Sequence, residues 1–240
     1  MKYKTLQSLA LIFFAWGFSS AALQAEGTDV HVKFRTLGAG VAADDLFYST
    51  GGKAHPVQVD TESRSVYYEY SGPVTGLSFF RLVPGPDGKP VPQTVALADL
   101  TGAGNRPLLV FMKNPDQADA LLVRGFPDSV KDIPPGGYRF LNFTACQIGI
   151  ILGTEKMVIK PGGSAIMQMN PPNGRLVSQV MLYGLLDNVA KPVYSNIWAF
   201  DAKVRQIVLV TPTNMSVTGG EVKCLSESVE NISADDKPGE

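Results

Sequence analysis

Residues Ile133–Gly153 read IPPGGYRFLNFTACQIGIILG, a tight turn followed by a dense apolar run. Pro134 and Pro135 fix the backbone angle φ and lack an N–H donor, whereas Gly136 and Gly137 tolerate the positive φ that a chain reversal needs. A glycine-rich phosphate cradle is followed by a helix, but a strand-like sequence follows here. The stretch therefore predicts a turn that delivers the chain into a sheet, and its glycines serve backbone geometry.

Short apolar runs of the same character recur along the chain. They are rich in β-branched and aromatic residues, and Gly, Pro, Asn or Asp separates them at intervals of about 8 to 12 residues. They include DVHVKF, HPVQV, SVYYEY, GLSFFRL, PLLVFM, YRFLNFT, QIGIIL, SAIMQM, QVMLYG, NIWAF and RQIVLV. No long window keeps the 3.6-residue apolar period of an amphipathic helix. The pattern predicts an all-β protein of sandwiches or barrels.

A weak internal repeat divides the chain into two halves. Five short matches carry it, with offsets that drift from 106 to 99 residues. They are VKF (32–34) with YRF (138–140), LFY (46–48) with IIL (150–152), FFR (79–81) with MLY (181–183), KPV (89–91) with KPV (191–193), and LLVF (108–111) with IVLV (207–210). An alternative explanation is that unrelated β-sandwiches share this rhythm of strands and turns. In either case the polar stretch Asn114–Asp119 is typical of a linker, so we expect β-sandwich domains over residues 26–115 and 116–225.

The first 25 residues have the pattern of a secretory signal peptide. Lys2 and Lys4 precede an apolar core at Leu9–Phe18, and small residues at Ala21–Ala25 form a cleavage zone. The alternative is an uncleaved membrane anchor, but a membrane span needs about 20 apolar residues and this run is shorter. We therefore expect an exported protein, periplasmic or extracellular, whose mature chain begins near Glu26 and has no transmembrane segment.

The composition excludes some partners. The formal net charge is -1 and no Lys/Arg cluster occurs, so we expect no binding to nucleic acid. Residues 226–240 are rich in acids and poor in apolar side chains, which predicts a disordered acidic tail.

Two segments resemble an uncharacterised family of exported bacterial proteins with immunoglobulin-like β-sandwich repeats. They are YRFLNFTACQIGIILGTEKMVIKPGGSAI (138–166) and, more faintly, VKFRTLGAGVAADDLFYSTGGKAHPVQVDTESRSVYYEYSGP (32–73). The resemblance covers most of the mature chain and consists of a turn pattern. It implies an envelope location and two immunoglobulin-like β-sandwich domains in tandem, and it supplies no catalytic residue.

Motifs that carry chemistry are scarce. GAGVAA (38–43) imitates a dinucleotide fingerprint, but Gly51, Gly52 and Pro56 leave no room for the helix that must follow. His31 and His55 are the only histidines and lack the spacing of paired zinc ligands, so we expect no metal and no cofactor.

Paired carboxylates are the one catalytic arrangement that the composition leaves open. Two carboxylates suffice for glycoside hydrolysis, and the candidates are Asp44–Asp45 with Asp60–Glu62. Because surface acids are far commoner than catalytic pairs, nothing in the sequence selects these four.

Cys146 and Cys224 are the only cysteines. In an exported chain two strand-borne cysteines favour a disulfide, and we predict that they pair. The alternative is two buried free thiols, because the sequence does not show whether their Cβ atoms face each other.

These observations favour a noncatalytic envelope module that binds a protein or glycan, or that supports an assembly. Its predicted contact surface includes Tyr67 and Glu69, because in SVYYEY these two side chains share one face of a strand while Tyr68 and Tyr70 share the other. Tyr67 could instead only cover a neighbouring strand. The alternative function is a polysaccharide hydrolase with an unrecognised carboxylate pair. An exposed apolar patch would favour the binding module, and a cleft holding two carboxylates would favour the hydrolase.

Overall fold

The computed structural model describes residues 28–169, 176–187, 189–213 and 216–228. These residues form strands and turns, with no helix among them, so the all-β prediction is confirmed. The strands are β1 (Asp29–Gly38), β2 (Ala43–Thr50), β3 (Lys53–Val59), β4 (Tyr68–Pro73), β5 (Leu77–Pro84), β6 (Pro90–Ala98), β7 (Pro107–Lys113), β8 (Leu121–Pro127), β9 (Gly137–Asn142), β10 (Gln147–Leu152), β11 (Glu155–Ile159), β12 (Ser164–Gln168), β13 (Val177–Leu186), β14 (Val189–Ala199), β15 (Val204–Thr213) and β16 (Ser216–Ser228).

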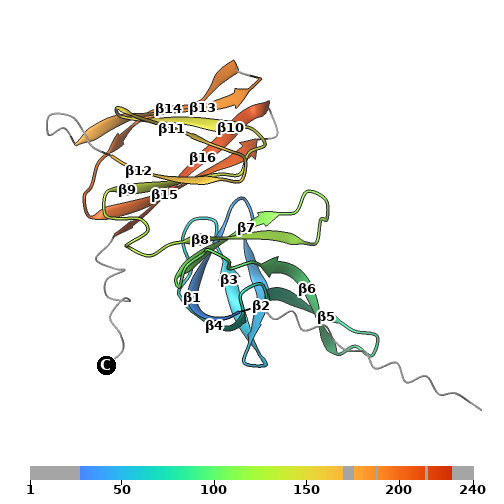
Figure 1. Ribbon diagram of the computed structural model, residues 1–240. Helices are drawn as coiled ribbons and strands as arrows, with labels where there is room; N and C mark the ends of the chain where they lie inside the picture. Colours follow the sequence, from blue (N-terminus) through green and yellow to red (C-terminus); the bar gives the residue numbers. More distant parts are fainter. Residues whose placement is uncertain (1–27, 170–175, 188, 214–215, 229–240) are drawn as a thin grey trace, which may run out of the picture.

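The strands form four sheets, which pack as two sandwich-like pairs (Figure 1). In the first unit, β1 to β8, the sheet orders are β4-β1-β7-β8 and β3-β2-β5-β6. In the second unit, β9 to β16, they are β12-β9-β15-β16 and β11-β10-β13-β14. The two units therefore have the same topology strand for strand, and even the parallel pair β1–β7 has its counterpart in β9–β15.

The shared topology matches the repeat in the sequence. Each of the five short matches joins equivalent strands: β1 with β9, β2 with β10, β5 with β13, β6 with β14 and β7 with β15. The first match places Phe34 and Phe140 at equivalent positions, and both are fully buried. This agreement is what a duplicated unit produces, because pairing order depends on the whole chain and not on local turn rhythm.

Each unit has its own apolar core between its two sheets. In the first unit, Phe34 contacts the rings of Tyr48 and Phe79 edge to face, with centroids 5.1 and 6.2 Å away. In the second, the ring of Trp198 stacks on Tyr138 and Phe140, with centroids 5.4 and 6.1 Å away. Alternation along the strands directs these side chains inward.

A third apolar cluster joins the units. The sheets β4-β1-β7-β8 and β12-β9-β15-β16 turn their outer faces toward each other (Figure 1). Their contact layer contains Leu37, Ala39, Leu108, Val110, Phe126, Ile133, Leu141, Ile207, Leu209 and Leu225. Because β9 is covered on both faces, all six of its residues are buried, which explains the dense apolar run after the Pro/Gly turn.

The prediction that Asn114–Asp119 is a linker between domains is wrong. These residues form the turn between β7 and β8, which pair antiparallel from Pro107↔Pro127 to Lys113↔Leu121. The first unit therefore extends to Pro127, and the chain crosses to the second unit between β8 and β9. A polar Pro-containing stretch suits a hairpin turn as well as a linker, and only the long-range pairing separates the two.

The predicted tail also begins too early. Residues 226–228 belong to β16, and Arg205 of β15 lies opposite Glu227 in the register. Residues 229–240 and the predicted signal peptide lie outside the described residues. Within the described ranges, no helix is long and apolar enough to cross a membrane.

The predicted disulfide is absent, and both cysteines are free thiols. Cys146 is buried just before β10, whereas Cys224 lies on β16, exposed, with its thiol hydrogen-bonded to Gln206. The two cysteines belong to opposite sheets of the second unit, and their separation is outside the range of a disulfide.

Candidate functional site

Tyr67 lies just before β4, where it is half-buried, and Glu69 lies within β4, where it is exposed. Tyr70 is buried and Tyr68 packs against the core, while Glu69 is exposed and forms an ion pair with Lys33 of β1 at 3.1 Å. Tyr67 precedes β4, and its ring lies under the guanidinium of Arg35, 5.1 Å from the ring centroid. Tyr67 therefore covers β1, which agrees with the plainer of the two sequence interpretations.

Arg106 also lies over the ring of Tyr67, at 5.6 Å from its centroid. Two cations against one ring form a cation–π arrangement on the outer face of the first unit. Its role as a binding surface stays a prediction.

The structure brings two of the candidate carboxylates together. Asp44 and Asp60 both line a cavity of about 440 Å³ between β2 and the end of β3. Asp60 has a local structural role, because its carboxylate accepts hydrogen bonds from the N–H of Glu62 at 2.7 Å and the hydroxyl of Ser63 at 3.4 Å.

The other two candidate carboxylates are held by cations. Asp45 pairs with Arg81 at 2.8 Å, and Glu62 pairs with Lys223 of the second unit. The four acids therefore do not form one constellation.

The histidines are separate from each other and from acids. His31 is hydrogen-bonded to Ser71 at 2.7 Å, and the ring of His55 lies against that of Tyr48 with centroids 5.5 Å apart. Within the described part of the chain, no group of three or more His, Cys, Asp or Glu side chains could hold a metal ion. The stretch GAGVAA forms the end of β1, the turn and the start of β2.

Exposed apolar side chains gather on the sheet β11-β10-β13-β14. Its inner face packs on the core, and its outer face lies on the side of the second unit away from the first (Figure 1). Of thirteen exposed large apolar side chains among the described residues, six belong to this sheet: Met157, Val158, Val177, Leu186, Val189 and Ile197. Strand alternation places Val158, Val177 and Ile197 on the outer face, whereas Met157 is on the edge strand β11 and Leu186 and Val189 are at the β13–β14 turn. Exposed apolar side chains that gather on one surface mark interaction sites in folded proteins.

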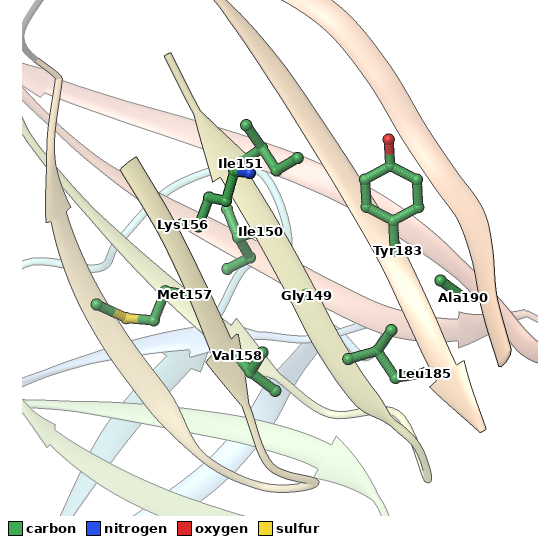
Figure 2. Close-up of a pocket in the computed structure, with 9 residues that line it drawn as sticks. All are labelled: Gly149, Ile150, Ile151, Lys156, Met157, Val158, Tyr183, Leu185 and Ala190. Carbon is green, nitrogen blue, oxygen red and sulfur yellow. The ribbon is translucent and has the colours of Figure 1, made fainter. Parts of the chain in front are cut away.

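A shallow groove of about 440 Å³ crosses this sheet. Gly149 of β10 forms its floor, because the register places the glycine between Val158 of β11 and Tyr183 of β13. Figure 2 shows the bare backbone of Gly149 between Val158 and Leu185. A Cβ atom at this position would lie 3.5 Å from Leu185, in ordinary van der Waals contact with that side chain.

The lining of the groove is almost entirely apolar. Lys156 is its single charged residue, and the other members are Gly149, Ile150, Ile151, Met157, Val158, Tyr183, Leu185 and Ala190 (Figure 2). A second hollow of about 560 Å³ shares Leu185 with it and reaches the start of β10. We call the surface formed by Lys156, Val158, Tyr183 and Leu185 around Gly149 the apolar groove.

Sequence reasoning missed the apolar groove. One signal was present, because QIGIIL has an apolar residue, Ile151, on the outer face of β10, where a solvated antiparallel strand carries polar side chains. Recognising it required knowing which face of β10 is covered by the other sheet of the same unit.

Charged side chains are also buried between the units. Arg205 is fully buried, and its guanidinium donates to the carboxylate of Glu227 at 2.8 and 3.0 Å. It also donates to the carbonyl oxygens of Asp128 at 2.7 Å and Ser129 at 3.1 Å. Arg205 therefore ties the crossing segment after β8 to β15 and β16.

Glu227 forms ion pairs with arginines of both units. Arg35 and Arg64 of the first unit pair with its carboxylate, the latter at 3.3 Å, beside Arg205 of the second. Burial by itself raises the pKa of Glu227, but the charges of Arg64, Arg35 and Arg205 outweigh burial and hold this pKa below its ordinary value of 4.5. Glu227 is therefore an anion that both units share.

A scan against models of known protein families finds no match to this chain, and a search of curated proteins finds none either.

Proposed function

We propose that the protein is a noncatalytic binding module of the cell envelope, which docks a partner protein on the apolar groove. The observation that carries this proposal is an exposed apolar groove on the outer face of the sheet that the first unit leaves uncovered. Its apolar lining favours apolar side chains of a polypeptide over the hydroxyl groups of a glycan, which require polar partners. The signal-like first 25 residues support the envelope location.

The lining also defines the chemistry of the partner. Val158 and Leu185 offer aliphatic contacts, and Tyr183 adds an aromatic ring with a hydrogen-bonding hydroxyl. Lys156 is the one charge at the groove, so a carboxylate beside the apolar side chains of the partner would complement it.

The test is a substitution that places a charge in the apolar groove at a side chain outside the apolar cores. Val158 is 55% exposed, so Val158→Lys leaves the fold intact and places an ammonium group on the docking surface. Leu97 of the first unit is 64% exposed, and Leu97→Lys is the matched control. We expect a photoreactive residue at position 158 to cross-link one envelope protein, and the purified partner to bind Val158→Lys about tenfold more weakly than Leu97→Lys. Equal affinity of the two variants would refute the docking surface.

A polysaccharide hydrolase is the second candidate, because Asp44 and Asp60 share one cavity. Two carboxyl groups across a cavity can act as acid and base or nucleophile. Turnover of a polysaccharide by the purified protein, abolished in Asp44→Asn, would favour the hydrolase and end the noncatalytic proposal.

A further inference from the structure

Another cavity lies between the two units, far from the apolar groove in the fold. It measures about 280 Å³ and is lined by Arg35, Glu62, Ser63 and Arg64 of the first unit and by Leu225, Ser226, Glu227 and Ser228 of the second. Its charged lining consists of two guanidinium groups, those of Arg35 and Arg64, and two carboxylates, those of Glu62 and Glu227. Ser226 and Ser228 alternate with Glu227 along β16, so they border the cavity with their backbone.

Both carboxylates already have cationic partners. Glu227 is held by Arg35, Arg64 and Arg205, and Glu62 is held by Lys223. Neither therefore has charge left to balance a further cation.

The surrounding buried charges have an excess of cations. Four guanidinium groups, those of Arg35, Arg64, Arg139 and Arg205, are associated with the carboxylates of Asp128 and Glu227. Cations still outnumber anions when Asp132 is counted, whose charge reaches Arg139.

One nitrogen on each of two of these arginines has no acceptor: Nη2 of Arg64 and Nε of Arg139 are buried and have no hydrogen-bond partner. Oδ1 of Asp128 also accepts no hydrogen bond, although it lies 3.5 Å from Nη1 of Arg205. The Arg64 side chain is only 3% exposed, although it borders the cavity. An unpaired buried donor destabilises the fold, and a charged one does so more strongly.

An arginine cannot relieve this imbalance by losing its proton. A lysine or histidine in the same place could become neutral, but a guanidinium stays charged and needs an anion or water nearby. An anion in the cavity supplies both the missing charge and oxygen acceptors.

We propose that this cavity binds one small tetrahedral oxyanion, phosphate or sulfate, either free or as an ester group on a larger ligand. Arg35 and Arg64 supply the charge, and the unpaired Nη2 of Arg64 donates to one of the anion's oxygens. Because residues of both units line the cavity, the bound anion also holds the units together. This site is independent of the apolar groove.

Calorimetric titration of the whole protein with sodium phosphate and sodium sulfate, in a chloride buffer of constant ionic strength, tests the proposal. We expect saturable binding at one site that sodium chloride does not reproduce. Arg35→Gln removes one of the two guanidinium groups at the cavity and is expected to weaken binding at least about tenfold through the lost charge. Arg81→Gln, which removes an arginine that pairs with Asp45 outside the cavity, is the matched control and keeps the affinity of the wild type.

Arg64→Gln provides a second variant, with retention of the fold checked by Trp198 fluorescence, and it is expected to lose binding. Glucose 6-phosphate and glucose 6-sulfate separate the two sources of the anion: tighter binding of a sugar ester than of the inorganic ion identifies a larger ligand, and tighter inorganic binding identifies the free ion. Absence of saturable binding to the wild type, or equal affinity in Arg35→Gln, would overturn the proposal. Val158→Lys should lose partner docking and still bind the anion, because the two sites are independent.

Discussion

At the residue scale, Glu227 shows how one side chain acquires its role from long-range pairing. It lies in a serine- and acid-rich stretch at the end of the chain, where the sequence favours a disordered tail. In the structure its carboxylate is shared by Arg35 and Arg64 of the first unit and Arg205 of the second. A carboxylate held in this way contributes to stability only while it is ionised.

The unfolding free energy should therefore depend on Glu227 and on pH. Its folded-state pKa lies below the ordinary 4.5, so its contribution is present above the unfolded-state pKa and is lost as the pH falls through the folded-state value. Glu227→Gln breaks a buried ion pair, and we expect a loss of about 3–5 kcal/mol at pH 7. Urea denaturation at pH 7, 5, 4 and 3 measures the unfolding free energy of each protein. The difference in unfolding free energy between the wild type and Glu227→Gln should become smaller below pH 5.

The control for this series is Glu69→Gln, which removes an exposed partner of Lys33. Its effect should stay within about 1 kcal/mol at pH 7, as for other surface ion pairs. If the difference in unfolding free energy between the wild type and Glu227→Gln is the same at pH 7 and at pH 3, the role assigned to Glu227 is wrong.

At the element scale, two strand glycines have different reasons to be glycine. Gly38 ends β1, where a Cβ atom would lie 1.8 Å from the carbonyl oxygen of Val41 as the chain turns into β2. Gly149 lies inside β10, where the nearest atom to a Cβ is a side-chain carbon of Leu185 at 3.5 Å. The first glycine is required by a close backbone approach, and the second leaves the apolar groove open.

Alanine substitutions should separate these two positions. Gly38→Ala forces the backbone at Val41 to move and should lower the unfolding free energy by about 1–3 kcal/mol or more. Gly149→Ala meets only ordinary van der Waals contact and should be neutral or stabilise the fold by up to about 1 kcal/mol, because alanine restricts the unfolded chain. Urea denaturation of both variants measures the difference, and equal losses would show that the turn after β1 can relax.

At the scale of the whole molecule, an apolar cluster with residues from both units lies between their equivalent sheets. Leu209 is 1% exposed and belongs to this shared cluster together with Leu37 and Leu108 of the first unit. Arg205 adds hydrogen bonds to the crossing segment at Asp128. Separation of the units would expose apolar surface and buried charge at once.

We therefore expect one cooperative unfolding transition for both units. Leu209→Ala should lower the unfolding free energy by about 2–5 kcal/mol, and it should destabilise the first unit as well as the second. Trp198 fluorescence reports on the second unit, and hydrogen exchange of the β1 and β7 amides reports on the first. Leu97→Ala, at an exposed position of β6, should change stability by less than about 0.5 kcal/mol. Two separate transitions, with only the second shifted by Leu209→Ala, would contradict a single body.

Local patterns in the sequence determined the strands, the Pro/Gly turns and the alternation that buries Tyr68 and Tyr70 while exposing Glu69, since these depend on backbone angles and on a two-residue period. The repeat also located equivalent strands correctly, because both units use the same order. Only the tertiary structure decided that Asn114–Asp119 is a hairpin turn, that Cys146 and Cys224 stay apart, and that Asp44 and Asp60 meet at one cavity. The physical reason is that strand pairing and sheet packing join residues far apart in the chain, and a single strand carries no information about which of its faces another sheet will cover. For the same reason the sequence does not show that Arg205, a residue type usually found on the surface, is fully buried. It also does not show that the outer face of β10 forms a groove that the first unit leaves uncovered.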